Sequence, residues 1–328
     1  SSHFGSRFWL TAPVAKGWPP SLPAHFGQRV MSSTVSVAWD AAQTFKEMVG
    51  TGFTKAHLPV SSMAVSGVMA GLFLSFGVNA MVNILYACPA EAAGPCKFLA
   101  GLGFSSGLYF ILCMGAELFT GNCLLFLAVL ARRIYWHEMV KDWLVIWVAN
   151  LAGSILAEML LFACGNSGTS AERTATGDIY CDIADAKSGL PPAQIFFRGI
   201  CANILVCIAV LIVSAAKSIE GKFFGCAIPI SVFIVSGFEH SIANMCIFSM
   251  AALLGCGGPG AYGKYVLNVA LATVGNTCGA CVLCLAAWVT TVRHSHLQLK
   301  EVPHPAAPSG ALGLPRSVVA DGPTTAEP

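Results

Sequence analysis

Two short polar runs, each inside a long apolar stretch, hold the residues of this sequence that are most able to do chemistry. One run contains Glu239 and His240 side by side, and the other contains Glu117 and Thr120. A carboxylate, an imidazole and a hydroxyl can orient or exchange protons. Inside a bilayer an unpaired charge costs between about 3 and 17 kcal/mol, so ionisable side chains there are neutral, paired or hydrated. Ionisable residues at membrane depth are functional by default, so these residues mark a candidate functional site.

The composition excludes a water-soluble globule and gives no electrostatic basis for binding nucleic acid. Of the 328 residues, 55% are hydrophobic and 10% are charged, whereas a soluble domain carries about 25% charged residues. The formal net charge is +2, and nucleic acid would require a clustered basic face. The apolar residues extend through one region from Leu58 to Val292, which predicts a single unit embedded in a membrane.

Six apolar stretches have the length of about 17–25 residues or more that a helix needs to cross a bilayer. Two of them, 98–131 and 223–254, are too long for one straight crossing and contain the two polar runs. We therefore expect these two to be broken helices. The six expected spans are Val60–Ala87, Phe98–Ala131, Trp143–Cys164, Ile195–Ala216, Phe223–Leu254 and Tyr265–Val292.

The segments outside the spans divide the chain into four parts. Residues 1–36 are expected to be a disordered cytoplasmic segment, and residues 37–55 an amphipathic helix on the inner membrane surface. Residues 56–294 form the expected transmembrane domain, and residues 295–328 a disordered tail rich in Pro, Ala, Gly and Ser. Lys and Arg are more frequent on the side of the two termini, which predicts that both termini are cytoplasmic.

The two halves of the transmembrane region repeat each other in sequence. Because each half has three spans, an odd number, the halves must have opposite orientations, which is an inverted repeat. A break in a membrane helix frees backbone groups that must be bonded by protein or line a wet cavity, so two matched breaks predict one central pathway. The matched elements are Gly115-Ala-Glu117 and Asn122 with Gly237-Phe-Glu239 and Asn244, Gly67-x-x-Ala70 with Gly199-x-x-Ala202, and Asn150-x-x-Gly153 with Asn276-x-x-Gly279.

Fourteen cysteines invite a metal or disulfide interpretation. Cys278, Cys281 and Cys284 form a C-x-x-C-x-x-C run in the sixth span, but the fourth cysteine of an iron–sulfur site is missing. We expect no metal and no cofactor. A disulfide could persist only on the outer side. The cysteines that flank or occupy the two predicted outer loops are Cys88 with Cys96 and Cys164 with Cys181.

The polar runs carry a resemblance to a known family. The run from Gly237 to Met245, Gly-Phe-Glu-His-Ser-Ile-Ala-Asn-Met, resembles the fifth-helix signature of the formate–nitrite transporters. Glu117-Leu-Phe-Thr-Gly-Asn122 is similar to the omega loop of that family's second helix. Phe197–Asn203 resembles its helix 4 opening and Asn276-x-x-Gly279 its helix 6, and the resemblance covers residues 50–294. The long loop between spans 3 and 4, the cysteine-rich spans and the tail resemble the branch in protozoan parasites that exports lactate with protons.

The resemblance implies a transporter, not an enzyme, built as a homopentamer of aquaporin-like protomers in the plasma membrane. Each protomer would have its own pore for protons and small monocarboxylate or similar anions, such as formate, lactate, pyruvate or nitrite. A bare carboxylate crossing an apolar constriction is penalised by several kcal/mol, while the neutral acid is not. Proton transfer to the anion near a central histidine would therefore lower the barrier.

The resemblance also implies roles for individual residues. The lysines at the two mouths would attract anions, and apolar constrictions on either side of the histidine would exclude hydrated ions. Leu108 stands where an aromatic residue is expected, which leaves the width of that constriction open. The substrate and proton pathway comprises His240, Thr120, Asn203, Asn244, Glu239 and Gly121; the constrictions comprise Phe104, Leu108, Ile111, Leu118, Val206 and Phe233; the vestibule lysines are Lys55 and Lys187.

The remaining polar residues of the spans have structural interpretations. Asn203 and Asn244 are expected to hold the freed backbone groups and the Glu239 carboxylate. Glu117 and Glu158 are expected to be polar packing residues between helices.

Three other functions compete with this interpretation. A passive aquaporin-like channel for water or small solutes would share the shape, although the sequence has no Asn-Pro-Ala motif at either break. An intramembrane hydrolase would use Ser241 or Thr120 as nucleophile with His240 as base. However, neighbours such as Ser241 and His240 do not face each other on a helix, and no Gly-x-Ser-x-Gly or His-Glu-x-x-His motif occurs. A channel with a charged ring would need Lys or Arg at a break, and neither break contains one.

Overall fold

The computed structural model describes residues 38–292, so the expectations for residues 1–36 and 295–328 lie outside the described residues. Within the described part the regular elements are helices. Five of them are long and apolar enough to cross a membrane. A further crossing consists of two shorter apolar helices, α9 (Ile219–Val235) and α10 (Ser241–Leu253). The expected all-α fold is confirmed. The five long helices are α2 (Val60–Tyr86), α3 (Ala93–Met114), α6 (Trp136–Ala163), α8 (Pro192–Ala215) and α11 (Ala261–Ala287), the last followed by the π-helical turn Trp288–Val292.

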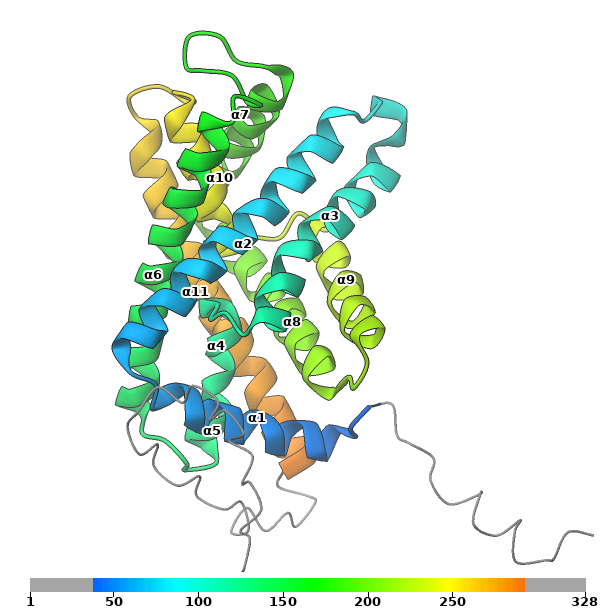
Figure 1. Ribbon diagram of the computed structural model, residues 1–328, viewed down its shortest axis with the longest axis vertical. Helices are drawn as coiled ribbons and strands as arrows, with labels where there is room; N and C mark the ends of the chain where they lie inside the picture. Colours follow the sequence, from blue (N-terminus) through cyan, green and yellow to red (C-terminus); the bar gives the residue numbers. More distant parts are fainter. Residues whose placement is uncertain (1–37, 293–328) are drawn as a thin grey trace, which may run out of the picture. The chain divides into compact units, whose positions relative to one another are not determined.

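The second and fifth crossings are interrupted at matching positions. Gly115 ends α3 with a φ of 70°, and Gly237 follows the end of α9 with a φ of 65°. Glycine adopts this left-handed conformation without the steric cost that a Cβ atom would add. After the first break the chain continues as α4 (Phe119–Asn122), a 3₁₀ turn (Cys123–Leu125) and α5 (Phe126–Leu130). Figure 1 shows α9 and α10 as separate rods joined by a non-helical connection.

Each half of the molecule packs its three spans in the same way. In the first half α2 packs on α3 and α6, and in the second half α8 packs on α9 and α11. A Cβ atom on Gly71 or Gly153 would overlap backbone atoms at the α2–α6 contact, and one on Gly275 or Gly279 would do so at the α8–α11 contact. Small residues therefore let these helix backbones approach closely.

The amphipathic helix predicted at residues 37–55 is α1 (Ala41–Ala56). Its N-terminus is capped by Asp40, whose side chain accepts a hydrogen bond from the Gln43 N–H at 2.8 Å. Met48 and Val49 are buried on the face that packs against α5, α6 and α8. Figure 1 shows α1, in blue, lying across the end of the bundle where α5 is found. This arrangement brings Lys55, in the last turn of α1, close to the first break.

Two features of the helices differ from the sequence prediction. Helix α6 begins at Trp136 rather than Trp143, because Glu138 bonds the Tyr135 N–H at 2.7 Å and caps a polar first turn that hydropathy does not detect. The predicted loop between spans 3 and 4 contains α7 (Ala175–Ser188). Thr174 caps this helix by accepting a hydrogen bond from the Gly177 N–H at 3.3 Å.

One of the two cysteine pairings suggested by the sequence is present. Cys88 and Cys96 form a disulfide, as their positions around the first outer loop suggested. Cys181 is bonded to Cys256 instead of Cys164, which is exposed and free. The predicted pairing with Cys164 was wrong. Cys181 lies on α7, a helix that was not expected, and α7 packs against α10, which Cys256 follows closely in the chain.

Candidate functional site

His240 lies at the N-terminus of α10, directly after the second break, and only 2% of its surface is exposed. Its Nδ1 accepts a hydrogen bond from the Ala243 N–H at 3.1 Å, and its Nε2 lies 2.9 Å from Oγ1 of Thr120. A backbone N–H can only donate, so Nδ1 carries no proton and the neutral ring has its proton on Nε2. The ring therefore donates to Thr120, and a second proton on Nδ1 would break the bond that caps α10.

Thr120 lies on α4, just after the first break, so the contact with His240 joins the two halves of the molecule. The Thr120 carbonyl accepts a hydrogen bond from Asn203 Nδ2 at 3.2 Å. The same Nδ2 donates to the Asn276 carbonyl at 2.8 Å. Oδ1 of Asn203 is buried and has no hydrogen-bond partner within residues 38–292. Three of the predicted pathway residues thus meet between the breaks.

Two asparagines, Asn150 on α6 and Asn276 on α11, bind the backbone of the breaks with identical patterns. Each accepts from one N–H and donates to one carbonyl of its break, which satisfies groups that the interrupted helix leaves free, and each donates also to a carbonyl inside the intact helix α2 or α8. From the sequence, this role was expected for Asn203 and Asn244. Asn150 and Asn276 were not predicted to hold the breaks, although the repeated Asn-x-x-Gly motif pointed to them. Asn150 donates to Gly67 O at 2.8 Å and Glu117 O at 2.9 Å and accepts from Phe119 N at 2.9 Å; Asn276 donates to Gly199 O at 2.8 Å and Glu239 O at 2.9 Å and accepts from Ser241 N at 2.9 Å.

The first of the two predicted vestibule lysines, Lys55, is ion-paired with the glutamate of the first break. Its Nζ lies 2.8 Å from Glu117 Oε2 and donates to Asn122 Oδ1 at 2.9 Å. Asn122 in turn donates to Asp142 Oδ1 at 2.9 Å. Glu117 was expected to be a packing residue. Its polar contact with another helix is this ion pair, in which Lys55 of α1 supplies the counter-ion.

The second vestibule lysine, Lys187 at the end of α7, forms the equivalent pair. Its Nζ lies 2.8 Å from Glu239 Oε1. The other carboxyl oxygen of Glu239 accepts from Asn244 Nδ2 at 2.7 Å and from Asn268 Nδ2 at 3.2 Å. Glu239 therefore has hydrogen-bond or ion-pair partners at both oxygens, and Asn244 holds its carboxylate as predicted. A paired carboxylate is the form in which a charge is tolerated at membrane depth.

A small cavity of about 30 Å³ lies between α1, α3 and the first break. It collects one vestibule lysine, three of the predicted constriction residues and Gly121. A Cβ atom on Gly121 would meet only Val210, at 3.6 Å, so this side of the break is open. The predicted residues among those that line the cavity are Lys55, Leu108, Ile111, Leu118 and Gly121.

Two other predicted constriction residues lie near the histidine itself. The ring of Phe233, on α9, lies 6.1 Å from the His240 ring between centroids. The Phe104 ring, on α3, lies 5.8 Å from that of Phe233. Five of the six predicted constriction residues therefore form two groups, one around the small cavity and one beside His240. The sixth, Val206, is buried in the apolar core that contains both groups.

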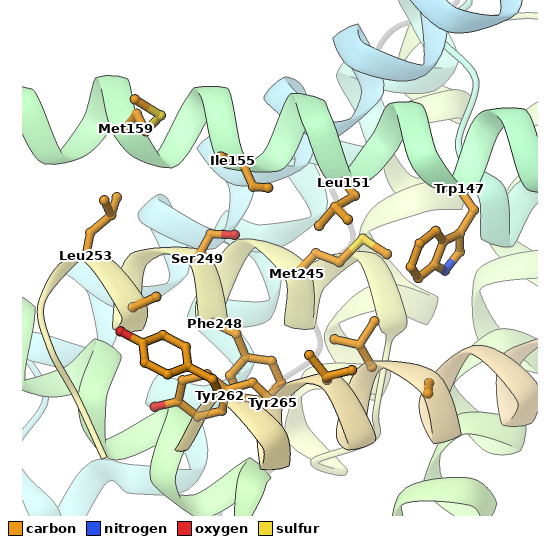
Figure 2. A pocket seen from close by; sticks show the side chains of 14 residues that line it. Trp147, Leu151, Ile155, Met159, Met245, Phe248, Ser249, Leu253, Tyr262 and Tyr265 are labelled. Atoms are coloured by element: carbon orange, nitrogen blue, oxygen red, sulfur yellow. The ribbon is translucent and has the colours of Figure 1, made fainter. Parts of the chain in front are cut away.

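A larger cavity of about 570 Å³ lies away from these residues, in a groove between α6, α10 and α11. Figure 2 shows that its walls are mainly apolar side chains, including Trp147, Leu151 and Phe248, with Ser249 and the hydroxyls of Tyr262 and Tyr265 among them. The groove contains no carboxylate, imidazole or lysine. Although this groove is larger than the cavity at the first break, its lining therefore does not suit anions or protons.

An inverted repeat of membrane helices, with a buried histidine and a hydroxyl meeting between two matched breaks, defines a membrane channel or transporter rather than an enzyme. Thr120 is the hydroxyl beside His240, and it accepts the hydrogen bond from the ring's Nε2–H, so that nitrogen has no lone pair with which to act as a base toward it. The family description "Formate/nitrite transporter" matches residues 42–290, and the chain belongs to this family of transporters and channels for small anions.

Similar proteins agree with this assignment. The chain is 31% identical over 269 residues to a "Probable formate transporter" of Methanothermobacter thermautotrophicus, covering 77% of this chain and 97% of that protein. It is 31% identical over 204 residues to the "Formate channel FocA" of Escherichia coli (strain K12), covering 61% of this chain and 69% of that protein.

Solved structures agree as well. A structure described as an "FNT family ion channel" has a TM-score of 0.70 and 27% identity and covers 76% of this chain and 99% of that chain. A "Pentameric formate channel with formate bound" has a TM-score of 0.61 and 26% identity and covers 71% of this chain and 97% of that chain.

Proposed function

We propose that this protein is a proton-coupled transporter of small monocarboxylate anions such as formate, lactate and pyruvate, with nitrite as a further substrate. It works as a homopentamer in the plasma membrane with both termini in the cytoplasm. The names of the relatives support small anions as substrates, and the pentameric formate channel supports the assembly. The substrate passes the centre of the protein as its neutral acid.

The observation that carries the proposal is the hydrogen bond between His240 and Thr120. Because the ring donates from Nε2 to Oγ1, the Thr120 hydroxyl keeps its own proton as a free donor. A carboxylate or nitrite oxygen that reaches this point meets a donor and an imidazole in a site with almost no exposure to water. Burial disfavours the charged form of the substrate more than the neutral acid, so uptake of a proton accompanies passage.

The lysine–glutamate pairs support the first and last steps of the route. Lys55 and Lys187 attract an anion to each mouth, while Glu117 and Glu239 keep the local charge balanced. A site must bind an ion well enough to admit it and weakly enough to release it. A lysine whose charge is partly compensated by a neighbouring carboxylate meets both requirements.

The proposal is tested by transport into proteoliposomes that contain the purified protein and a pH-sensitive dye. Labelled formate, lactate, pyruvate and nitrite are supplied at two external pH values. We expect uptake to acidify the interior and to increase when the external pH is lowered. Uptake without proton movement would contradict coupling, and comparable swelling with water or glycerol would instead indicate a passive channel.

The small cavity offers a separate test of the route. Gly121→Ala should be tolerated, because a Cβ there makes only an ordinary contact with Val210. Gly121→Leu should fill the cavity and reduce uptake of every substrate while the oligomer stays intact on size-exclusion chromatography. Undiminished uptake by the leucine variant would show that substrate does not pass this cavity.

A further inference from the structure

Glu158, on α6, is a buried carboxyl group that the transport route does not use. It is 0% exposed, and neither carboxyl oxygen has a hydrogen-bond partner among the described residues. Ser75 faces it from α2 and Tyr180 from α7, and the hydroxyls of both are likewise buried without partners. Four orphaned polar atoms from three helices therefore gather in one place. A buried polar atom without a hydrogen-bond partner destabilises the folded state.

Two further polar side chains border this cluster. Cys246, on α10, lies near Glu158, and its Sγ contacts the Ser154 hydroxyl at 3.4 Å. Ser154 donates to the Asn150 carbonyl at 2.9 Å. The titratable groups that face Glu158 are thus Tyr180 and Cys246. Neither is a cation, and Lys187 of α7 is already paired with Glu239.

The inverted repeat supplies an internal control for this cluster. The positions that correspond in the other half to Ser75, Ser154, Glu158, Tyr180 and Cys246 are all buried and apolar or weakly polar. The same packing is therefore achieved without a carboxyl or a hydroxyl, so the fold itself does not require them. The counterparts, in the same order, are Cys207, Ala280, Cys284, Met48 and Leu124.

We propose that Ser75, Glu158 and Tyr180 form a buried proton-binding site in which Glu158 is held as a neutral carboxylic acid. An ionised carboxylate in this place would be an unpaired charge at membrane depth. The neutral acid has one donor, and each hydroxyl adds one donor and an acceptor. The cluster therefore offers both donors and acceptors around the neutral acid, whereas an ionised carboxylate could only accept. Burial raises the pKa of Tyr180, so its phenol remains a donor.

The site has a structural consequence that is independent of the proposed transport function. Tyr180 belongs to α7, the helix that carries Lys187 and is bonded through Cys181 to Cys256. The proton on Glu158 therefore contributes to holding α7 against α2 and α6. Loss of the proton would leave a charge beneath this helix.

Infrared difference spectra of the reconstituted protein test the proposal directly, because a protonated carboxyl has a C=O band that an ionised carboxylate lacks. Wild type minus Glu158→Gln should show the loss of this protonated band at neutral pH. Glu220→Gln is the matched control: Glu220 is exposed, so its removal should affect only ionised carboxylate bands. If the Glu158→Gln spectrum shows the loss of ionised carboxylate bands instead, the proposal is overturned.

Two more variants extend the test. Tyr180→Phe should shift the protonated band, because the carboxyl loses the neighbouring hydroxyl dipole; an unmoved band would overturn the role of Tyr180. If Glu158→Gln does not assemble, Ser75→Cys combined with Glu158→Cys copies the pair Cys207 and Cys284 of the other half. This double variant should fold and lack the band. Retention of the band would show that it arises elsewhere and overturn the assignment to Glu158.

Discussion

The two helix breaks have the same support but different chemistry. At each break a lysine pairs with a glutamate, Lys55 with Glu117 and Lys187 with Glu239, both at 2.8 Å. At each break an asparagine from the third span of that half makes the same three bonds to the backbone. The duplicated residues are thus those that stabilise an interrupted helix.

The differences between the breaks lie in the residues next to them. Leu118 precedes α4 in the position where His240 precedes α10, and only the histidine caps its helix with a side chain. In the first half Asn122 donates a hydrogen bond to Asp142, whereas in the second half the corresponding Asn244 donates to Asn268. The two halves therefore share a fold but not the residue that can exchange protons. A single imidazole, that of His240, contacts both halves through its hydrogen bond to Thr120.

The largest effect is expected from removing the asparagines that hold the breaks. Asn150→Ala and Asn276→Ala each leave one buried carbonyl and one buried N–H of a break without the asparagine that binds them, at about 1–3 kcal/mol per group. Thermal unfolding of the purified oligomer should show a similar loss of stability for both variants. A large loss for one and none for the other would break the equivalence of the two halves.

The next largest effect is expected from removing the lysines. Loss of one partner of a buried ion pair costs about 3–5 kcal/mol, less where water reaches the remaining charge. The side chain of Glu239 is 2% exposed and that of Glu117 is 9% exposed. Lys187→Met should therefore destabilise the protein more than Lys55→Met in thermal unfolding. Adding Glu239→Gln to Lys187→Met should restore part of the stability; no recovery would mean that the ion pair is not the cause.

His240→Leu gives the second break the residue type of Leu118, its counterpart at the first break. This substitution should reduce transport more than it reduces stability. We expect flux to be abolished or uncoupled from protons, with the oligomer intact on size-exclusion chromatography. Thr120→Val removes the hydrogen bond to His240 and the hydroxyl donor proposed to meet the substrate; with each contributing about 1 kcal/mol, it should lower flux by roughly tenfold or more. Unchanged proton-coupled flux in His240→Leu would exclude the imidazole from the mechanism.

The smallest effect is expected from Asp142→Asn, which gives the first half the side chain that the second half has. Asp142 Oδ2 is buried without a hydrogen-bond partner in the described chain, and an amide retains an acceptor for Asn122. Stability should change by no more than about 0.5–1 kcal/mol. The reverse change, Asn268→Asp, removes donors to Glu239 and to the Lys187 carbonyl and should destabilise clearly more. Equal effects in chemical denaturation would contradict this asymmetry.

The membrane crossings and their breaks could be predicted from the sequence because both depend on neighbouring residues: the length of an apolar stretch and the glycines within it. The lysine–glutamate pairs escaped prediction because each joins a helix to a break far away in the sequence: Lys55 and Glu117 are 62 residues apart, and Lys187 and Glu239 are 52 apart. Helix α7 was detectable in principle, since the repeat places it opposite α1 and Lys187 opposite Lys55. Its polar composition concealed it from a search for apolar spans.

The sequence alone determined that the chain crosses a membrane, that two crossings are broken, and that the halves are inverted copies. These properties follow from apolar length, from residues that interrupt a helix and from an odd number of spans in each half. Only the tertiary structure decided which nitrogen of His240 carries its proton and which glutamate balances each lysine. Hydrogen bonds and ion pairs depend on distances between atoms of different helices, and close packing sets those distances.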